Sequence, residues 1–314
     1  MKEKKPSITA VILTYNEQIH LQRCLDSLKN CVEKIYVIDS FSSDSTEDIA
    51  NNNNISIIHI EWENSYSKKY NTALNTIDFK TDWVLRIDAD EYLTERLATE
   101  IVQNVDKTPE NVKGIFVTRT IKFMDRELKY GGMHPVYTMR LWRAGFGKCE
   151  SKLMDEHIVL SEGDTINYKN CLIDDNLKGI DDWIDKHNTY STKEAIDMLR
   201  IESDCVSSNQ ISKKIFGNQV NRTRKLKSYY AKNPLFIRAF IFFIYRYVFR
   251  MGFRDGIAGF CWNFLQGLWY RMLVDIKILD IKRQSKKKNV SLDIYIRDKY
   301  GFELCQKNNV RPDN

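Results

Sequence analysis

The sequence lacks the cysteine spacings of a disulfide framework and of a zinc finger. No two cysteines form a CxxC pair, although there are seven, at positions 24, 31, 149, 171, 205, 261 and 305. This pattern gives no support to the small disulfide-rich or metal-finger classes. It is typical of reduced thiols in a cytosolic compartment.

Long uncharged apolar runs are also missing. The N-terminal stretch MKEKKPSITAVILTYNE turns polar at Asn16 and Glu17, too early for the apolar region of a signal peptide. In the aromatic C-terminal third, the longest uncharged run is residues 256–270, which is 15 residues. A membrane-spanning helix needs roughly 20. We therefore expect the protein to stay inside the cell.

Acidic residues are absent from residues 205–254, which carry 11 Lys and Arg. Residues 1–204 carry 26 Lys and Arg against 35 Asp and Glu, and residues 255–314 carry 11 against 7. The formal net charge of +6 therefore combines an acidic body with a basic C-terminal third. Such asymmetry indicates a polyanionic surface as a partner.

The chain has enough apolar sequence for a sizeable core. It has 314 residues, 43% of them hydrophobic, which suits one large domain or a domain with an appendage. Apolar runs that predict strands alternate with segments of helical period, the runs being residues 8–16, 34–39, 55–62 and 83–87. Asp44 and Ser45 are suited to cap a helix that begins near Thr46. Continuous apolar strands between amphipathic helices predict a parallel sheet covered on both sides.

Polar side chains follow three of these four strands. The first strand ends in Thr14, Tyr15, Asn16 and Glu17, the second in Asp39 and Ser40, and the fourth in Asp88 and Asp90. Ligands of such sheets bind beyond the carboxyl ends of the strands. Two carboxylates one residue apart can share a hard cation whose shell is completed by phosphates. A solvated turn is the alternative for the tripeptide alone, but its position after a buried strand favours a site.

Several motifs together resemble a known family. They are VILTYNEQIHLQRCLDSL, VIDSFSSDST, WVLRIDADEYL, MRLWR, MDEHI, WIDKHNTYSTKEA and FIYRYVFRMGFRDGIAGFCWNFLQGLWYRMLVDIK. In this order and spacing they resemble the inverting family 2 glycosyltransferases of GT-A fold, and most closely the bacterial branch that builds lipopolysaccharide core, capsule and other surface glycans. The likeness runs from about residue 8 to about residue 280.

The resemblance implies a nucleotide-diphosphate sugar donor held by the N-terminal sheet. By this analogy the donor site consists of Thr14, Tyr15, Asn16, Glu17, Asp39, Ser40, Asp88 and Arg140. Asp39 would hold the base, Asp88 would face the ribose or the metal shell, and Asp90 would ligate Mg²⁺ or Mn²⁺ between the phosphates. Family habit points to uridine diphosphate as the nucleotide. A cation at this position offsets the charge that develops on the departing diphosphate.

An inverting transfer also needs a base for the acceptor hydroxyl. The resemblance implies a carboxylate from the second half of the domain, and KLMDEHIVL offers Glu156, which we favour, and Asp155. The related branch often has His before Glu here, whereas this chain reads Asp-Glu-His. The alternative is that one of the two carboxylates orients His157 or a loop.

Two nearby residues have simpler interpretations. His20, on the predicted first helix, is interpreted as a surface residue. Arg86 lies two residues before Asp88 on the same side of the strand, and a structural salt bridge is its expected role.

The basic third predicts contact with a membrane surface. Aromatic residues interleaved with arginines suit helices that lie in the interface of an anionic membrane, and residues 211–275 have this composition. A buried helical hairpin with solvated arginines is the alternative. Nucleic acid is not expected, because no recognition motif accompanies the patch. The expected location is cytoplasmic and peripheral, on the cytoplasmic face of the inner membrane.

The sequence thus predicts a GT-A type α/β fold with a mainly parallel sheet over residues 1–205, divided into a donor half, 1–108, and an acceptor half, 109–205. Residues 206–314 would form the membrane-associating helical region. The predicted function is metal-dependent, inverting sugar transfer to a glycan or lipid-linked acceptor of surface polysaccharide synthesis. One rival is a nucleotidyltransferase, which would want a Gly-rich, basic loop that TYNEQIH lacks. The other is a non-catalytic membrane scaffold.

Overall fold

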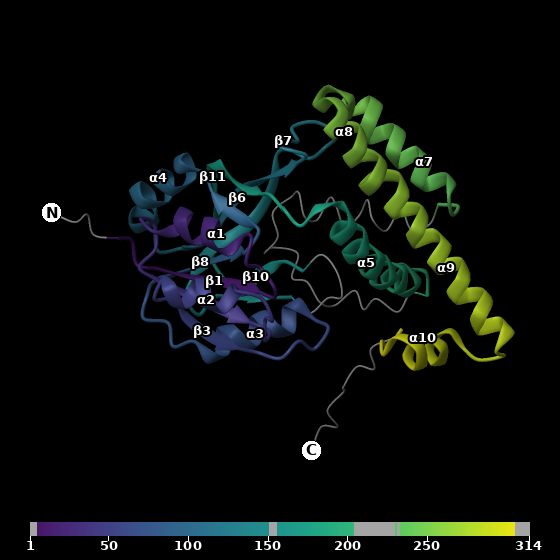
Figure 1. Ribbon diagram of the computed structural model, residues 1–314, viewed down its shortest axis with the longest axis horizontal. Helices are drawn as coiled ribbons and strands as arrows, with labels where there is room; N and C mark the ends of the chain where they lie inside the picture. The colour runs from purple at the N-terminus through teal and green to yellow at the C-terminus, as the bar shows by residue number, and fades with distance from the viewer. Residues whose placement is uncertain (1–4, 151–155, 204–229, 231–232, 305–314) are drawn as a thin grey trace, which may run out of the picture. The chain divides into compact units, whose positions relative to one another are not determined.

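The computed structural model describes residues 5–150, 156–203, 230 and 233–304 (Figure 1). Asp155 and nearly all of the basic segment 204–232 lie outside these residues. By packing, the chain divides into two units, the first comprising Met1–Gly179 and Arg250–Phe260 and the second Ile180–Phe249 and Cys261–Asn314. The division differs from the boundary expected near residue 205, because residues 180–203 pack with the second unit and residues 250–260 with the first.

The first unit contains a nine-stranded sheet whose main path runs β3-β2-β1-β4-β8-β6-β11-β5, with β7 paired to β6. Its strands are β1 Ile8–Thr14, β2 Lys34–Asp39, β3 Ser56–His59, β4 Trp83–Asp88, β5 Glu91–Leu93, β6 Val112–Phe123, β7 Arg126–Glu127, β8 Val136–Arg143 and β11 Asp164–Asp174. A separate hairpin pairs β9 Gly147–Cys149 with β10 Ile158–Leu160.

The sheet is mixed, which corrects the expectation of a mainly parallel one. Strands β3, β2, β1 and β4 are parallel, as predicted. Beyond β4, strand β8 is antiparallel to both β4 and β6, and β5 is antiparallel to β11. The parallel half consists of strands separated by helices, whereas β6 and β8 follow one another without an intervening helix and can pair antiparallel. The result is an α/β architecture of GT-A-like type.

Helices cover this sheet where the helical periods predicted them. They are α1 Leu21–Leu28, α2 Thr46–Asn52, α3 Tyr66–Thr76 and α4 Glu95–Asn104, with the 3₁₀ turn η1 Val105–Lys107 after α4. Alternate residues of β1, Ile8, Ala10 and Ile12, share one buried cluster with Leu25 of α1 and Leu97 of α4. This cluster fixes β1 in the centre of the sheet and therefore fixes where its carboxyl end lies.

The second unit is helical. Its elements are α5 Gly179–Glu202, α7 Ile237–Ile244, the π-helical turn η2 Tyr245–Phe249, the π-helical turn η4 Asn263–Trp269, α9 Tyr270–Lys287 and α10 Leu292–Tyr300. The connecting turn η3 Gly252–Asp255 and most of α8 Gly256–Trp262 pack with the first unit. Among the described helices, none combines the length and apolar character that crossing a membrane requires.

Candidate active site

The carboxyl ends of three neighbouring strands bring the predicted donor residues to one edge of the sheet. In the parallel register, Thr14 of β1 pairs with Asp39 of β2, and Leu13 pairs with Asp88 of β4. The strand ends are therefore level with one another. The tertiary structure brings Thr14 close to residues that lie 25 and 74 positions later in the sequence, Asp39 and Asp88, as the crevice rule for α/β sheets predicts.

Asp39 is buried at the centre of a hydrogen-bond network. Its Oδ1 accepts from the hydroxyls of Thr14, at 2.7 Å, and Ser42, at 2.6 Å, and its Oδ2 accepts from the Ser42 backbone N–H at 2.7 Å. Lys69 of α3 is also buried and donates to the Thr14 carbonyl at 2.7 Å. Burial lowers the pKa of Lys69 to about 8, although Asp39 and Glu17 act to raise it. This network holds the ends of β1 and β2 in one geometry.

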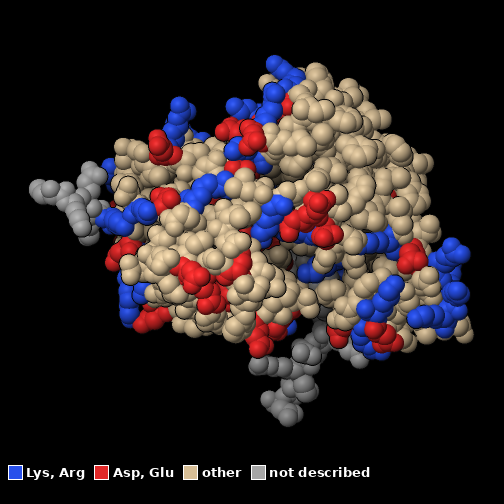
Figure 2. Space-filling view, in the orientation of Figure 1, with Lys and Arg blue, Asp and Glu red and all other residues tan. Residues whose placement is uncertain are grey.

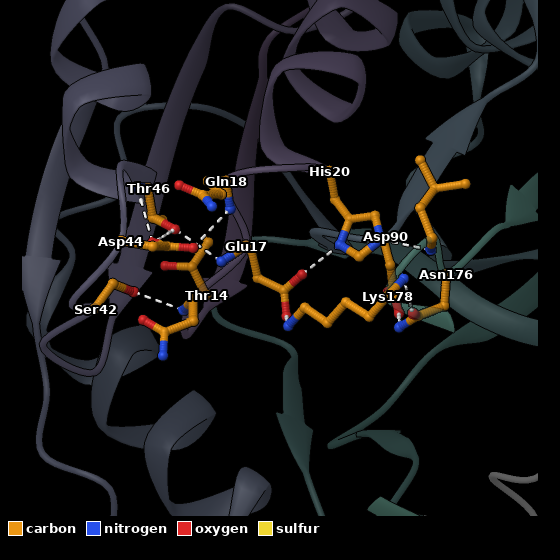
Figure 3. A network of polar contacts seen from close by, with 12 residues as sticks. Thr14, Glu17, Gln18, His20, Ser42, Asp44, Thr46, Asp90, Asn176 and Lys178 are labelled. Atoms are coloured by element: carbon orange, nitrogen blue, oxygen red, sulfur yellow. Dashed lines mark hydrogen bonds and ion pairs between the residues drawn. The ribbon is translucent and has the colours of Figure 1, made fainter. Parts of the chain in front are cut away.

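The loop after β1 is bonded to the loop after β2 (Figure 3). Asn16 has a left-handed backbone conformation, with φ of 54°, and its N–H donates to the Ser42 hydroxyl at 2.8 Å. The Gln18 N–H donates to Asp44 Oδ2 at 3.1 Å, while Asp44 Oδ1 accepts from the Thr46 N–H at 3.0 Å. Asp44 thus bonds the first N–H of α2, as predicted for a cap, whereas Ser45, at the N-cap position, makes no side-chain capping bond. The two loops form one rigid rim.

A second set of bonds ties this rim to the segment after β11. The Leu177 N–H donates to Nε2 of His20 at 2.8 Å, so Nδ1 carries the ring proton and donates to Glu17 Oε2 at 2.6 Å. Lys178 Nζ donates to Glu17 Oε1 at 2.8 Å (Figure 3). Burial acts to raise the pKa of Glu17, but the bonds from His20 and Lys178 lower it below its ordinary value. His20 is fully buried, so its interpretation as a surface residue was wrong.

The D-x-D loop is joined to the same segment. Asn176 Nδ2 donates to Asp90 Oδ2 at 3.1 Å, and the Asp175 N–H donates to the Asp90 carbonyl at 3.0 Å. Arg23 of α1 bonds both the Asp175 carboxylate, at 2.6 Å, and the Asp90 carbonyl, at 3.3 Å. The carboxylate of Asp90 is thereby held at the edge of the sheet while remaining partly exposed.

Asp88 lies between two guanidinium groups. Arg86 Nε is 3.7 Å from Asp88 Oδ1, and Arg140 NH2 is 3.6 Å from Asp88 Oδ2. The salt bridge expected for Arg86 is therefore present. Arg140 is also paired with Glu91, whose other oxygen, Oε2, accepts from the Asp88 N–H at 3.1 Å. Burial raises the pKa of Glu91 well above its ordinary value, against the opposing effect of Arg140.

Two predicted donor residues have contrasting positions. The Tyr15 ring is 58% exposed beside the rim and is accessible to a ligand. Ser40 is buried, and its hydroxyl donates to the Ile60 carbonyl at 2.9 Å, after β3. Its side chain therefore fastens the end of β2 to the chain beyond β3, and its predicted contact with the donor stays a prediction.

Glu156 lies two residues before β10, the second strand of the β9–β10 hairpin. Asn71 of α3 bonds both the backbone N–H and the carbonyl of Cys149 at 2.8 Å, which anchors the hairpin to α3. Arg86 NH1 approaches Cys149 Sγ at 3.9 Å. Burial raises the pKa of Cys149 to about 11, Arg86 opposes this, and the nearby charge of Glu156 adds to it. The charge of Glu156 therefore lies near Cys149, the hairpin residue that Arg86 contacts. Arg86 in turn pairs with Asp88.

The carboxylates of the D-x-D loop fit a hard cation. Both are partly exposed, and oxygen ligands of this kind are those that Mg²⁺ and Mn²⁺ prefer. Another group, formed by Asp39, Glu47 and His59, has its ligand atoms within 4.8 Å of one another. Both Asp39 oxygens already accept hydrogen bonds, so this group fits a metal less well than the loop does.

Sequence reasoning missed several residues of this site. Glu91 received no role, yet it is the buried partner of Arg140. Lys69, Asn176 and Lys178 received no role. The sequence offered a signal for Glu91, because neighbouring residues at a strand end, such as Asp90 and Glu91, point to opposite faces. It offered none for Lys178 and Asn176, whose partners are more than 80 residues away in the sequence.

Comparisons with known proteins point to one family. Residues 9–155 match the family model described as "Glycosyl transferase family 2". An uncharacterized glycosyltransferase of Rickettsia bellii is 37% identical over 94 residues, which are 30% of this chain and 31% of that protein. The SPbeta prophage-derived glycosyltransferase SunS of Bacillus subtilis is 36% identical over 92 residues, 28% of this chain and 21% of that protein. The chain therefore matches less than a third of the length of these relatives.

Solved structures give a weaker likeness. The crystal structure of glucosyl-3-phosphoglycerate synthase from Mycobacterium tuberculosis in complex with Mn²⁺, uridine diphosphate and glucosyl-3-phosphoglycerate has 19% sequence identity and a TM-score of 0.31. The match covers 36% of this chain and 44% of that one. At this TM-score the likeness contributes nothing to the assignment of a ligand or a reaction.

Proposed function

We propose that the protein is a glycosyltransferase that moves a sugar from a nucleotide-diphosphate donor to an acceptor hydroxyl with inversion, and the match of residues 9–155 to the family 2 model supports this. The observation that supports this most directly is the level register of Thr14, Asp39 and Asp88 at one edge of the sheet. These residues belong to three of the motifs on which the family resemblance rests.

The nucleoside would bind beside the rim that the loops after β1 and β2 form. The Asp39 carboxylate, held by Thr14 and Ser42, is suited to accept from an N–H of the base. Tyr15 presents an exposed ring beside it. Because the rim is already bonded in place, little conformational entropy would be lost on binding. Uridine diphosphate is the first nucleotide to test.

The diphosphate would lie over the D-x-D loop. Asp88 and Asp90 would hold Mg²⁺ or Mn²⁺, which when bound offsets the negative charge that the leaving diphosphate develops. Arg86 and Arg140 flank Asp88 within 3.7 Å. They reduce the repulsion between Asp88 and the phosphates, and their own positions are fixed by Glu91 and Cys149.

Glu156 is the proposed base, with Asp155 as the alternative that lies outside the described residues. The carboxylate takes the proton of the acceptor hydroxyl while that oxygen bonds to the anomeric carbon. On the opposite face, the bond from the anomeric carbon to the phosphate oxygen breaks, and its electron pair leaves with the diphosphate. Attack opposite the leaving group inverts the anomeric configuration.

The acceptor we propose is a glycan or a lipid-linked glycan of bacterial surface polysaccharide or lipopolysaccharide synthesis, reached from the cytoplasm. The likeness of the motifs to that branch of the family supports this choice. Acceptor preference in such enzymes depends on the shape of loops, where one methyl or hydroxyl group changes the outcome.

Calorimetric titration of uridine diphosphate tests the proposal. With Mn²⁺ we expect saturable binding, which a chelator weakens strongly and Asp90→Ala abolishes. Asp82→Ala is the matched control, because Asp82 is an exposed acid just before the opposite end of the same strand, β4. If another nucleoside diphosphate binds in place of uridine diphosphate, only the proposed identity of the donor nucleotide changes. Failure of every nucleoside diphosphate, with and without metal, would contradict the transferase mechanism and favour a scaffold.

A further inference from the structure

Helix α7 and the turn η2 that continues it expose a row of apolar side chains. Seven residues over 13 positions are 47–73% exposed: Ile237, Phe240, Ile241, Ile244, Tyr245, Val248 and Phe249. They recur at alternating steps of three and one, so they lie along one side of the helix. We call this row the outward stripe.

The inward side of the same helix carries arginines. Arg238 and Arg246 are only 3% and 8% exposed. Arg238 forms a buried ion pair with Asp275 of α9, and Asp275 also accepts from the Phe236 N–H at 2.7 Å. A helix that packs in water turns its apolar stripe inward and its arginines outward. Helix α7 instead exposes an apolar stripe and buries two arginines together with Ala239, and an exposed apolar stripe is the arrangement expected when the outer side of a helix meets an apolar medium.

The surroundings of the stripe within the second unit carry few charged side chains. Figure 2 shows almost no charged residues over α7 and the first part of α9, whereas charges gather toward the end of α9 and over α10. Helix α9 adds two half-exposed apolar side chains, Ile276 and Leu279. Contiguous exposed apolar surface of this kind marks a site of interaction with a membrane or a protein.

The adjoining sequence carries only positive charge. Arg250 and Arg254 follow η2 directly and are exposed. Residues 205–254 contain 11 Lys and Arg and no Asp or Glu. This charge complements an anionic surface. A protein partner is less well matched, because protein interfaces carry regular hydrogen bonds and Tyr245 alone offers a polar side-chain atom in the stripe.

We propose that the outward stripe lies in the boundary between headgroups and acyl chains of an anionic lipid bilayer, with the helix parallel to the membrane plane. The stripe has 13 helical positions, fewer than the roughly 20 that crossing requires, so the helix lies in the interface and does not span it. This surface is separate from the donor site and goes beyond the proposed function.

The test is cosedimentation of the full chain with vesicles of phosphatidylcholine and phosphatidylglycerol. We expect the double variant Ile241→Ser and Phe249→Ser to partition roughly tenfold more weakly or worse than the unchanged chain. The matched control is Met124→Ser with Ile294→Ser, which removes two exposed apolar side chains outside the stripe and leaves partitioning unchanged. All four positions are exposed, so thermal unfolding should confirm that both variants fold.

Several outcomes would overturn the proposal. One is equal partitioning of the stripe variant and the unchanged chain. Another is no binding to the vesicles at low salt. A third is a dimer that the stripe substitutions dissociate, without vesicle binding, which would assign the stripe to a second copy of the chain. Equal binding to vesicles with and without phosphatidylglycerol would contradict the preference for an anionic bilayer. Titration of the stripe variant with uridine diphosphate distinguishes this surface from the donor site, because the affinity of the variant for the nucleotide should equal that of the unchanged chain.

Discussion

At the scale of single residues, Asp39 shows how a buried carboxylate is prepared for a ligand. Three neutral donors from Thr14 and Ser42 fix both oxygens, and the buried cation Lys69 lies near enough to interact electrostatically with the carboxylate. Hydrogen bonds to an ionised acceptor are stronger than those between neutral groups. The same bonds that stabilise the loop therefore also orient the oxygens toward the proposed base of the nucleotide.

We expect Asp39→Asn to lower nucleotide affinity by roughly tenfold or more, and to lower the free energy of unfolding by ~1–3 kcal/mol. The new amide group would face either the Ser42 N–H or a hydroxyl that now donates to Asp39, leaving a buried donor unsatisfied. Titration calorimetry and chemical denaturation measure the two effects. Asp82→Asn should change neither, and full nucleotide affinity in Asp39→Asn would contradict the role of Asp39.

His20 supports a second prediction. His20→Leu keeps a similar volume but leaves Glu17 and the Leu177 N–H without their bonds, so the free energy of unfolding should fall by ~1–3 kcal/mol. The KM for the donor should rise, because the loop after β1 loses the His20–Leu177 bond to the segment after β11 and keeps the Lys178–Glu17 bond. His59→Leu, at a site 41% exposed, should change stability by less than about 0.5 kcal/mol. Equal effects of the two substitutions would show that the His20 bonds are unimportant.

At the scale of elements, one ion pair joins two strands that pair with different neighbours. Arg140 of β8 is bonded to Glu91 of β5 and lies beside Asp88 of β4. Arg140→Met should reduce the free energy of unfolding by ~3–5 kcal/mol, because it leaves Glu91 buried without a cation. Adding Glu91→Gln should recover part of the loss. Chemical denaturation of the single and double variants checks this, and strictly additive losses would contradict it.

Helix α5 contains a group that makes the second unit sensitive to acid. His187 stacks on Trp183 at 3.5 Å, and burial lowers its pKa to about 4, from 6.5. Between these values the unfolded chain binds the proton and the folded chain does not, so this contribution to stability falls as pH decreases from about 6.5 to about 4.

Between pH 7 and pH 4.5, the free energy of unfolding should fall for both proteins. We expect the fall to be ~1–2 kcal/mol smaller in His187→Phe than in the unchanged chain. The ring stack and its volume are largely retained, while the titrating group is removed. Asp and Glu residues titrate in both proteins, so the difference between the two pH dependences isolates His187. Identical pH dependence would show that His187 is protonated in the folded state.

At the scale of the whole molecule, residues 250–260 pack with the first unit, although residues 180–249, which precede them, belong to the second. Asp255 is buried and accepts from the backbone N–H groups of Lys129 and Tyr130, at 3.0 and 2.9 Å. The Gly131 N–H donates to the Arg250 carbonyl at 2.9 Å. The loop after β7 therefore depends on a segment more than 115 residues later in the sequence.

Asp255→Ala should expose this dependence. We expect amide hydrogen exchange at Lys129, Tyr130 and Gly131 to accelerate strongly and the free energy of unfolding to fall by ~1–3 kcal/mol. Asp293→Ala, in α10 of the second unit, is the control and should leave exchange in this loop unchanged. For the same reason, a fragment that ends at residue 205 should show the fast exchange. Normal protection in both proteins would contradict the assignment of residues 250–260 to the first unit.

Much of the N-terminal half was predictable because its signals are local. Apolar runs gave β1 to β4 close to their observed bounds, segments of helical period indicated helices between the strands, and the strand ends pointed to Thr14, Asp39 and Asp88. The mixed half was not predictable in this way. Which neighbour β8 or β11 pairs with depends on partners tens of residues away, and the apolar pattern of a strand does not specify its direction.

The sequence by itself carried the motifs that match the family 2 glycosyltransferase model over residues 9–155, and it placed acids at the ends of consecutive strands. Periodicity and motif order carry this information within short windows. Tertiary structure alone decided that His20 is buried, that Glu91 pairs with Arg140, that Lys178 reaches Glu17, and that the arginines of α7 point inward. The physical reason is the same in each case: burial and pairing of a charged group depend on which distant segments surround it, and no short window of sequence contains them.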